Sequence, residues 1–254
     1  MLVSDLHAAL DGRFPFADAA DWDPVGLQIG AVDRSVGRVA VCHVVTEDVV
    51  ATVLDGRFTT LVSYHPVLLQ PTNLFVDGPD AVGRTLRLAE GGVSVVTVHT
   101  ALDAADPGTG DHLLASLGWA AAGRWGAVRD DGSDAIGRFA RIAEVSGADL
   151  ATHVRQVLGA SVRSTPPETA VEVVAVIPGS GSSFIDEAAA FADALITGDV
   201  SHHRARGAAD RGLMVLDAGH AATEFAGIQA LYAAVDDIVD GAVFVGDDPT
   251  PWEG

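Results

Sequence analysis

Cysteine is almost absent from this chain, and lysine is absent altogether. The 254 residues include one cysteine, Cys42, and all 15 basic residues are arginines. A lone cysteine excludes an internal disulfide and a metal site built from several thiolates. Because Cys42 ends the apolar run 39–42, it is predicted to be a small buried residue and not a nucleophile. Any metal ligands must therefore be nitrogen and oxygen atoms.

Positive charge is also scarce. The chain has 35 acidic and 15 basic residues, a formal charge of −20, which disfavours nucleic acids and anionic lipid as partners. No apolar stretch reaches the roughly 18 residues of a membrane-spanning helix, and the first residues lack the features of a signal peptide. A hydrophobic fraction of 48% and a mean hydropathy of +0.29 argue against disorder. These features predict a folded cytoplasmic protein that binds neither nucleic acid nor membrane.

Strand-like apolar runs alternate with helical segments through most of the chain. The expected strands are 39–45, 61–63, 93–98, 138–145, 171–177, 194–197, 213–216 and 242–245. Such alternation predicts an α/β fold with mixed, largely parallel sheets. The stretch 120–137 is rich in glycine and charge, and it is the predicted boundary between a first half, 1–122, and a second half, 137–254.

The two halves repeat one order of features. Each has a helix, a strand, histidine, a second helix, a second strand, and then a histidine followed four positions later by an acid. This order predicts an internal duplication, in which two similar α/β halves pack as one unit. A pseudo-twofold axis between such halves is a natural place for a metal site.

The repeated histidine–acid pairs indicate metal-binding chemistry. His99 and Asp103 follow one strand, and His220 and Glu224 follow another. Residues four apart on a helix share a face, and ligands bind at the carboxyl ends of strands in open α/β sheets. His65, at the end of the strand 61–63, is a third candidate. Imidazole and carboxylate together are ligands for zinc, iron, manganese or nickel.

A glycine-rich loop and two adjacent histidines allow more than one interpretation. The loop follows a strand and opens a helix, so it is either a plain turn or an anion site formed by Gly179, Ser180, Gly181 and Ser182. His202 and His203 begin a helix, where Asp199 or Ser201 can act as the cap. These two histidines are expected to support the metal ligands or an interface, in preference to ligation.

The remaining histidines and the loop before the first strand are less informative. Asp23 and Gly26 either orient ligands or simply make a turn. Four other histidines lack an acidic partner in a matching context and are interpreted as ordinary helix or core residues: His7, His43, His112 and His153.

Six blocks in a fixed order resemble one protein family. They are WDPVGLQIG (22–30), SYHP (63–66), VHTALDAADPGTGDHLLASLG (98–118), PGSGSSF (178–184), ITGDVSHH (196–203) and DAGHAATE (217–224). Together they resemble the NGG-one-interacting factor three-like proteins, also known as GTP cyclohydrolase 1 type 2 homologs or dinuclear metal centre hexameric proteins. The resemblance covers nearly the whole chain.

The resemblance implies a set of site residues. The implied metal ligands are His65, Asp103, His220 and Glu224, with one carboxylate bridging two divalent ions. His99 lies beside them either as a residue that supports the ligands or as a catalytic group, which in the hydrolase hypothesis acts as the proton shuttle. The family motif has two adjacent histidines where this chain has Tyr64 and His65. A neutral phenol is a poorer ligand than imidazole. Tyr64 is therefore expected to be a weak ligand or a substitute for one, which leaves one or two ions per chain.

The resulting functional hypothesis is a metal-dependent hydrolase that acts on a nucleotide- or phosphate-ester-like small molecule, assembled by self-association as a hexameric ring. The alternative is a non-catalytic metal-binding regulatory or metal-chaperone-like oligomer. The two differ in water access, because a catalytic metal keeps an open coordination position and a structural site is closed by protein ligands.

Overall fold

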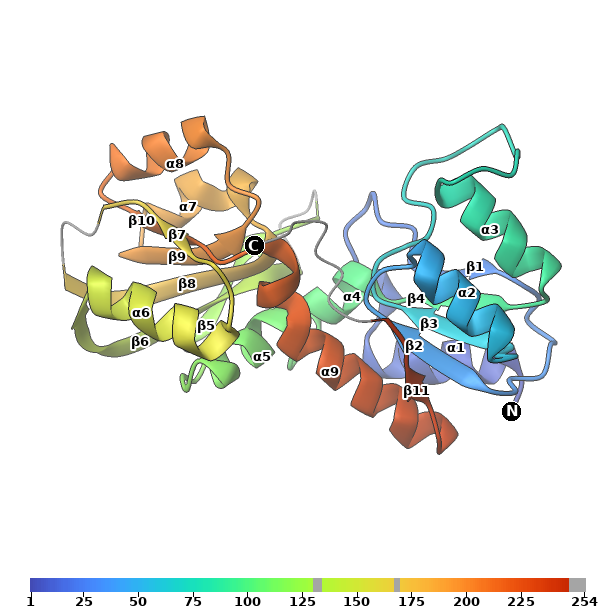
Figure 1. Cartoon of the computed structure of the whole chain (residues 1–254). Helices are drawn as coiled ribbons and strands as arrows, with labels where there is room; N and C mark the ends of the chain where they lie inside the picture. Colours follow the sequence, from blue (N-terminus) through green and yellow to red (C-terminus); the bar gives the residue numbers. More distant parts are fainter. Residues whose placement is uncertain (130–133, 167–169, 247–254) are drawn as a thin grey trace. The chain divides into compact units, whose positions relative to one another are not determined.

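The computed structural model describes residues 1–129, 134–166 and 170–246 of the chain. Two units are distinguished: unit 1 comprises Met1–Ala105 and the segment that begins at Ile228, and unit 2 comprises Asp106–Gly227. Each contains one mixed sheet, with strand order β1-β4-β3-β2-β11 in unit 1 and β5-β6-β8-β9-β10-β7 in unit 2 (Figure 1). The predicted mixed α/β class is confirmed.

The sheet of unit 1 is built on three parallel neighbours, β2 (Val39–Cys42), β3 (Thr60–Ser63) and β4 (Ser94–Thr97). The short strand β11 (Val243–Phe244) lies parallel beside β2, and β1 (Gly26–Ile29) runs antiparallel along β4. Cys42, Ser63 and Thr97 are aligned in register at the carboxyl ends of the three strands. The residues that follow them therefore lie at the same edge of the sheet.

Helices cover both faces of this sheet. Val41, Val62 and Val96 share a core with α1 (Val3–Arg13) and with the Ile228–Val239 part of α9 (His220–Val239). On the opposite face, Ala40 and Leu61 pack with α2 (Glu47–Asp55) and α3 (Ala81–Glu90). Figure 1 shows these two helices on one side of the sheet. All residues of β2, β3 and β4 are buried, as expected for strands covered on both faces.

Two helix ends have the capping residues that the sequence predicts. Thr46 caps α2 by accepting a hydrogen bond from Val49 N at 3.2 Å. The helix α5 (Thr109–Ser116) is followed by Gly118 at φ +83°, a left-handed conformation that favours glycine. Unit 1 also contains two short helices, η1 (Phe16–Asp18) and α4 (His99–Ala104).

The sheet of unit 2 also contains three parallel neighbours, β8 (Ala170–Ser180), β9 (Ala194–Gly198) and β10 (Met214–Asp217). The antiparallel strands are β7 (Arg163–Ser164) beside β10, β6 (Ala135–Ser146) beside β8, and β5 (Gly123–Ala127) beside β6. One face packs against α5 and α6 (Gly147–Leu158). The other packs against α7 (Ile185–Ala188) and α8 (His202–Ala209), and η2 (Ser182–Phe184) leads into α7.

The two sheets share their central order. In each, three consecutive parallel strands lie side by side in chain order, and a short antiparallel strand pairs with the third of them. The division into units falls at 105/106 and 227/228, and the predicted boundary between two halves at 120–137 remains a prediction. Within that stretch, residues 123–127 form β5 and residues 135–137 begin β6, both in unit 2, and residues 130–133 lie outside the described residues. The last expected strand, 242–245, contains β11 and joins the sheet of unit 1.

Among the residues that the structure describes, no helix is long and apolar enough to cross a membrane.

Candidate metal centre

A row of aromatic side chains follows the carboxyl ends of β2, β3 and β4. Hydrogen bonds continue the strand pairing beyond the sheet, because His65 N donates to His43 O and His99 N donates to Tyr64 O, each at 3.0 Å. The rings are consequently neighbours: the centroids of His43 and His65 are 5.2 Å apart with the rings stacked, and those of His65 and His99 are 5.0 Å apart. Parallel strands thus bring three imidazoles from distant sequence positions to one edge.

Tyr64 lies in this row but turns its hydroxyl toward a carboxylate. The side chain is 1% exposed, and its hydroxyl donates to Asp103 Oδ1 at 2.7 Å. A phenol that donates its hydrogen is in the neutral form. Tyr64 is therefore placed to hold Asp103, and its predicted role as a weak ligand or substitute remains a prediction.

His99 begins α4 in a strained conformation and is contacted by a buried acid. Its φ is +36°, which is rare for a residue with a side chain. Its Nδ1 lies 2.9 Å from Oδ2 of Asp23, whose side chain is fully buried and also accepts from Thr100 N at 3.0 Å. Burial would raise the pKa of Asp23, but the contacts from His99 and Thr100 outweigh it and lower that pKa. Asp23, ambiguous from sequence, thus contacts a site residue.

In unit 2, His220 stands between two carboxylates. Its Nδ1 lies 2.6 Å from Asp199 Oδ2, and its Nε2 lies 3.1 Å from Glu224 Oε1. The His220–Glu224 contact is the i, i+4 pairing that the sequence predicts on a helix. The Glu224 side chain is 4% exposed, whereas that of His220 is 36% exposed. The pair is therefore mostly buried on the carboxylate side and open on the imidazole side.

These carboxylates control the protonation of His220. Burial by itself would lower the pKa of the ring, but the hydrogen bonds and negative charges of Glu224 and Asp199 are stronger and raise it to about 9. A raised pKa means that the ring is positively charged below about pH 9, with a carboxylate facing each of its nitrogens.

Two glycines allow the pair to pack against backbone. A Cβ atom on Gly179 would lie 2.4 Å from Glu224 Oε1, and one on Gly198 would lie 2.5 Å from His220 N. Gly179 also has φ +72°. A side chain at Gly179 would displace the Glu224 carboxylate, and one at Gly198 would displace the backbone of His220, which explains why glycine stands in the blocks PGSGSSF and ITGDVSHH.

The glycine-rich loop has much of its hydrogen-bonding capacity already engaged. Gly179 N donates to Thr223 Oγ1 at 2.9 Å, and Gly181 N donates to Thr197 Oγ1 at 2.8 Å. The hydroxyl of Ser182 donates to the carbonyl of Asp199 at 2.9 Å. An anion site here remains a prediction, and it would have to use backbone amides other than those of the two glycines.

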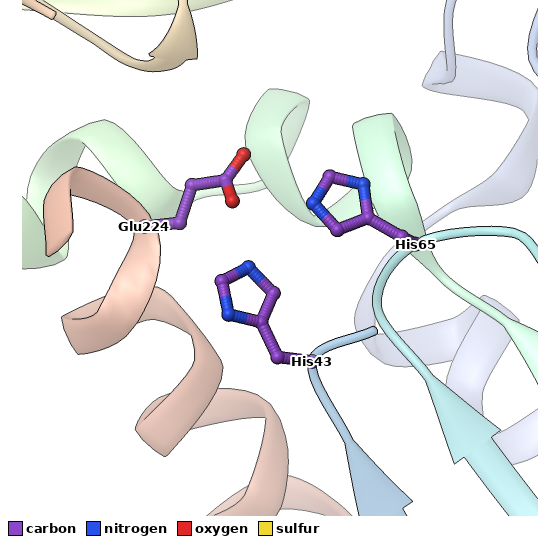
Figure 2. A group of neighbouring side chains, drawn as sticks. All are labelled: His43, His65 and Glu224. Carbon is purple, nitrogen blue, oxygen red and sulfur yellow. The ribbon is translucent and has the colours of Figure 1, made fainter. Parts of the chain in front are cut away.

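Three potential ligands form a group that could hold a metal ion. His43, His65 and Glu224 each offer one ligand atom, and these atoms lie within 4.8 Å of one another. Figure 2 shows the three side chains, the histidines coming from the ends of strands and the glutamate from a helix. Nitrogen and oxygen donors of this kind suit zinc, iron, manganese or nickel. The thiol of Cys42 is buried, and burial raises its pKa, so a thiolate ligand is not expected.

The group overlaps only partly with the predicted ligands. The group contains the predicted ligands His65 and Glu224, but it does not contain Asp103 or His220. The predicted set of four ligands therefore remains a prediction. His43 was missed by sequence reasoning, which interpreted it as an ordinary residue. A signal was available, because His43 directly follows the apolar strand Val39–Cys42, as His99 follows its own strand.

The other histidines lie elsewhere. His202 and His203 are the first residues of α8, are exposed and contact each other, with ring centroids 5.5 Å apart. Ser201 caps that helix, which leaves Asp199 for its contact with His220. A supporting role for His202 and His203 remains a prediction. His153, by contrast, packs beside Trp119 and contacts Leu117 O, as expected of an ordinary helix residue.

A model of the family described as Duf34/NIF3 (NGG1p interacting factor 3) matches residues 1–246. The chain belongs to the Duf34/NIF3 family. A GTP cyclohydrolase 1 type 2 homolog of Streptomyces coelicolor is 32% identical over 94% of this chain and 87% of its own length. The predicted family resemblance is thereby confirmed.

Solved structures show the same fold. A protein of Thermus thermophilus has a TM-score of 0.84 at 25% identity and covers 99% of this chain and 100% of its own. A hypothetical protein of Staphylococcus aureus has a TM-score of 0.86 at 21% identity and covers 100% of this chain and 99% of its own. The fold of this Duf34/NIF3 chain is therefore shared along its entire length.

Proposed function

We propose that this Duf34/NIF3 protein binds a divalent metal ion and acts as a metal-dependent hydrolase. The observation that carries the proposal is the group of His43, His65 and Glu224, whose potential ligand atoms lie within 4.8 Å of one another. His220 is the proposed fourth ligand, since its Nε2 lies 3.1 Å from Glu224 Oε1. This donor set of imidazoles and a carboxylate fits a transition-metal ion such as zinc.

The chemistry follows from the donor set and its surroundings. A bound divalent ion would act as a Lewis acid and lower the pKa of a coordinated water. The exposed side of His220 leaves access for solvent and a small molecule. His99, contacted by Asp23 through Nδ1, is the proposed proton shuttle, because its Nε2 can then exchange a proton with a reacting group.

The contact between Tyr64 and Asp103 affects how many metal ions the site is proposed to bind. The hydroxyl of Tyr64 donates to Asp103 Oδ1, so one oxygen of the carboxylate expected to bridge two ions is already engaged. We propose one firmly held ion per chain and a second position that is weak or empty. The ion is one of zinc, iron, manganese or nickel, which the donor atoms do not distinguish.

The substrate class follows from the relatives. The name GTP cyclohydrolase 1 type 2 homolog, carried by the relative from Streptomyces coelicolor, favours a nucleotide-like compound. GTP, other nucleotides and simple phosphate esters are therefore the compounds to test first. We also propose that the chain assembles with copies of itself, as a hexameric ring.

Elemental analysis of protein purified without added metal, followed by a hydrolysis screen of these compounds, tests the proposal. His65→Ala and Glu224→Gln should lose bound metal and activity together, while His153→Gln, outside the site, should change neither. Wild-type protein that holds metal but hydrolyses none of the compounds would favour the non-catalytic regulatory or metal-chaperone alternative. Wild-type protein that takes up no metal would refute both.

A further inference from the structure

The row of aromatic side chains at the carboxyl edge of the unit 1 sheet continues beyond His99 to Trp22. The ring centroids of Trp22 and His99 are 5.9 Å apart, and those of His99 and His65 are 5.0 Å apart. Exposure rises along the row: His43 is 4% exposed, the side chain of His99 is 12% exposed, and Trp22 is 60% exposed. Trp22 is therefore the end of the row that faces solvent.

The turn that carries Trp22 is held firmly to the start of α4. Asp23 N closes the turn by donating to Ala20 O at 2.8 Å. Both ends of the turn are bonded to Thr100, since Ala20 N donates to Thr100 Oγ1 and Thr100 N donates to Asp23 Oδ2, each at 3.0 Å. Thr100 directly follows His99 in the chain. The turn therefore places Trp22 beside the proposed proton shuttle.

The indole of Trp22 is accessible in spite of this fixed backbone. Tryptophan has a large apolar surface and is highly buried on average, so an exposed tryptophan beside a group of potential ligands calls for a partner. The planes of Trp22 and His99 are inclined at 71°, so the imidazole contacts the indole without stacking on its face. With Trp22 60% exposed, much of the indole is available to a second flat ring.

We propose that Trp22 is a stacking platform that binds the planar heteroaromatic ring of the substrate, such as a nucleobase. The inference rests on the proposed function and names the part of the substrate that Trp22 recognises. Every base has a π face and can stack on an indole. A ring stacked on Trp22 lies next to His99, whose own ring is adjacent to that of the proposed ligand His65. The formal charge of −20 does not oppose this contact, because the base is neutral.

Two compounds that differ by one ring system test the proposal. GMP carries a purine base, and ribose 5-phosphate has the same sugar and phosphate without it, so calorimetry with each compound isolates the contribution of the base. We expect wild-type protein to bind GMP more tightly than ribose 5-phosphate. Trp22→Ala should bind GMP about 5- to 150-fold more weakly than wild type, the usual effect of removing one stacking side chain. It should bind ribose 5-phosphate as wild type does.

Conservative and control variants separate stacking from a merely structural role. Trp22→Phe keeps an aromatic ring and should retain most of the GMP affinity, whereas Trp22→Leu keeps an apolar side chain without a π face and should lose it. GMP should quench tryptophan fluorescence more in wild type than in Trp22→Phe, which lacks the stacked indole. The control is Val32→Ala, which shortens a similarly exposed apolar side chain of the same unit, 59% accessible, and should bind GMP as wild type does.

Wild-type protein that binds GMP no more tightly than ribose 5-phosphate would overturn the inference, as would an unchanged GMP affinity in Trp22→Ala. An equal loss for both compounds would also overturn it, because Trp22 would then support the fold and not the bound ring. Trp22→Ala that loses self-association in gel filtration while binding GMP normally would assign the indole to an interface between copies and contradict the proposal.

The outcome for Trp22 can be distinguished from that for the proposed function. If GMP binds through Trp22 but the protein takes up no metal and hydrolyses no compound of the screen, the proposed function fails and the stacking role stands. If wild type and Trp22→Ala hydrolyse nucleotides with equal kcat/KM, the proposed function stands and the stacking role fails.

Discussion

Tyr64 places a phenol beside His65, at the position where the resemblance to the family implies a second histidine. Its ring lies 4.8 Å from that of His65 and 5.4 Å from that of His99, and its hydroxyl reaches Asp103. The phenol therefore stands beside two imidazoles and donates to a carboxylate that is one of the predicted metal ligands. The effect of Tyr64 is predicted to be on the number of ions held.

Restoring histidine tests this effect. Tyr64→His should take up more metal per chain than wild type, because neutral imidazole is a better ligand than a protonated phenol and Asp103 would no longer accept from the hydroxyl. Elemental analysis after gel filtration gives the stoichiometry. Tyr64→Phe is the matched control, since it removes the hydroxyl without adding a ligand. Equal metal content in wild type and Tyr64→His would contradict the prediction.

The protonation of His220 predicts a pH dependence of metal binding. In metal-free protein the pKa of the His220 ring is raised to about 9, above its ordinary 6.5, so a metal ion that binds to this ring below pH 9 must displace a proton. Metal affinity should rise about tenfold per pH unit toward pH 9 and then level off. The same shift means that His220 stabilises the metal-free protein fully below pH 6.5 and loses this contribution as the pH rises through 9.

Calorimetry of metal binding at about pH 8, in buffers of different ionisation enthalpy, counts the protons released. About one proton per ion is expected from His220. Glu224→Gln removes one of the two negative partners that raise the pKa of the ring, so it should release fewer protons and bind metal more weakly. Binding in wild type without proton release would contradict the proposed ligation by His220.

At the scale of elements, the strands and helices could largely be predicted from the sequence, because buried strands and amphipathic helices leave strong patterns. The strands β2, β8 and β9 overlap the apolar runs 39–45, 171–177 and 194–197 that predict them. The partners of the site residues could not be predicted in the same way. Asp199 is predicted as a possible helix cap and is instead hydrogen-bonded to His220, and His43 joins Glu224, a residue far away in sequence. Such contacts depend on strand order, which local patterns do not encode.

The loop after β8 offers a direct test of how elements shape the site. Gly179→Ala would place a Cβ atom 2.4 Å from Glu224 Oε1 at φ +72°, so it should displace the carboxylate and weaken metal binding. Gly159→Ala is the control, since Gly159 has φ +62° but no atom within 4 Å of the added Cβ. Both should lose about 1–2 kcal/mol of stability from the left-handed backbone. Only Gly179→Ala should lose metal affinity, measured by titration alongside thermal unfolding. Equal affinities would contradict the packing argument.

At the scale of the whole molecule, the chain passes between its two units twice. It enters unit 2 after Ala105 and returns at Ile228, within α9. The sequence predicts this helix but not the change of unit inside it, because periodicity marks a buried face without indicating which core the face joins. The repeated strand order was easier to predict, since each copy keeps its own apolar runs and histidine–acid pair.

Self-association is the prediction that belongs to this scale. Unit 1 exposes the consecutive apolar residues Leu74, Phe75 and Val76, with 72%, 58% and 71% of their surfaces accessible. Apolar residues exposed in a row are uncommon on a protein that remains monomeric. Light scattering coupled to gel filtration should therefore give a mass well above the 26.1 kDa of one chain, and six times that mass for a hexameric ring. Repeating the measurement with a chelator shows whether assembly depends on metal. A stable species at 26.1 kDa across the concentrations tested would refute the ring.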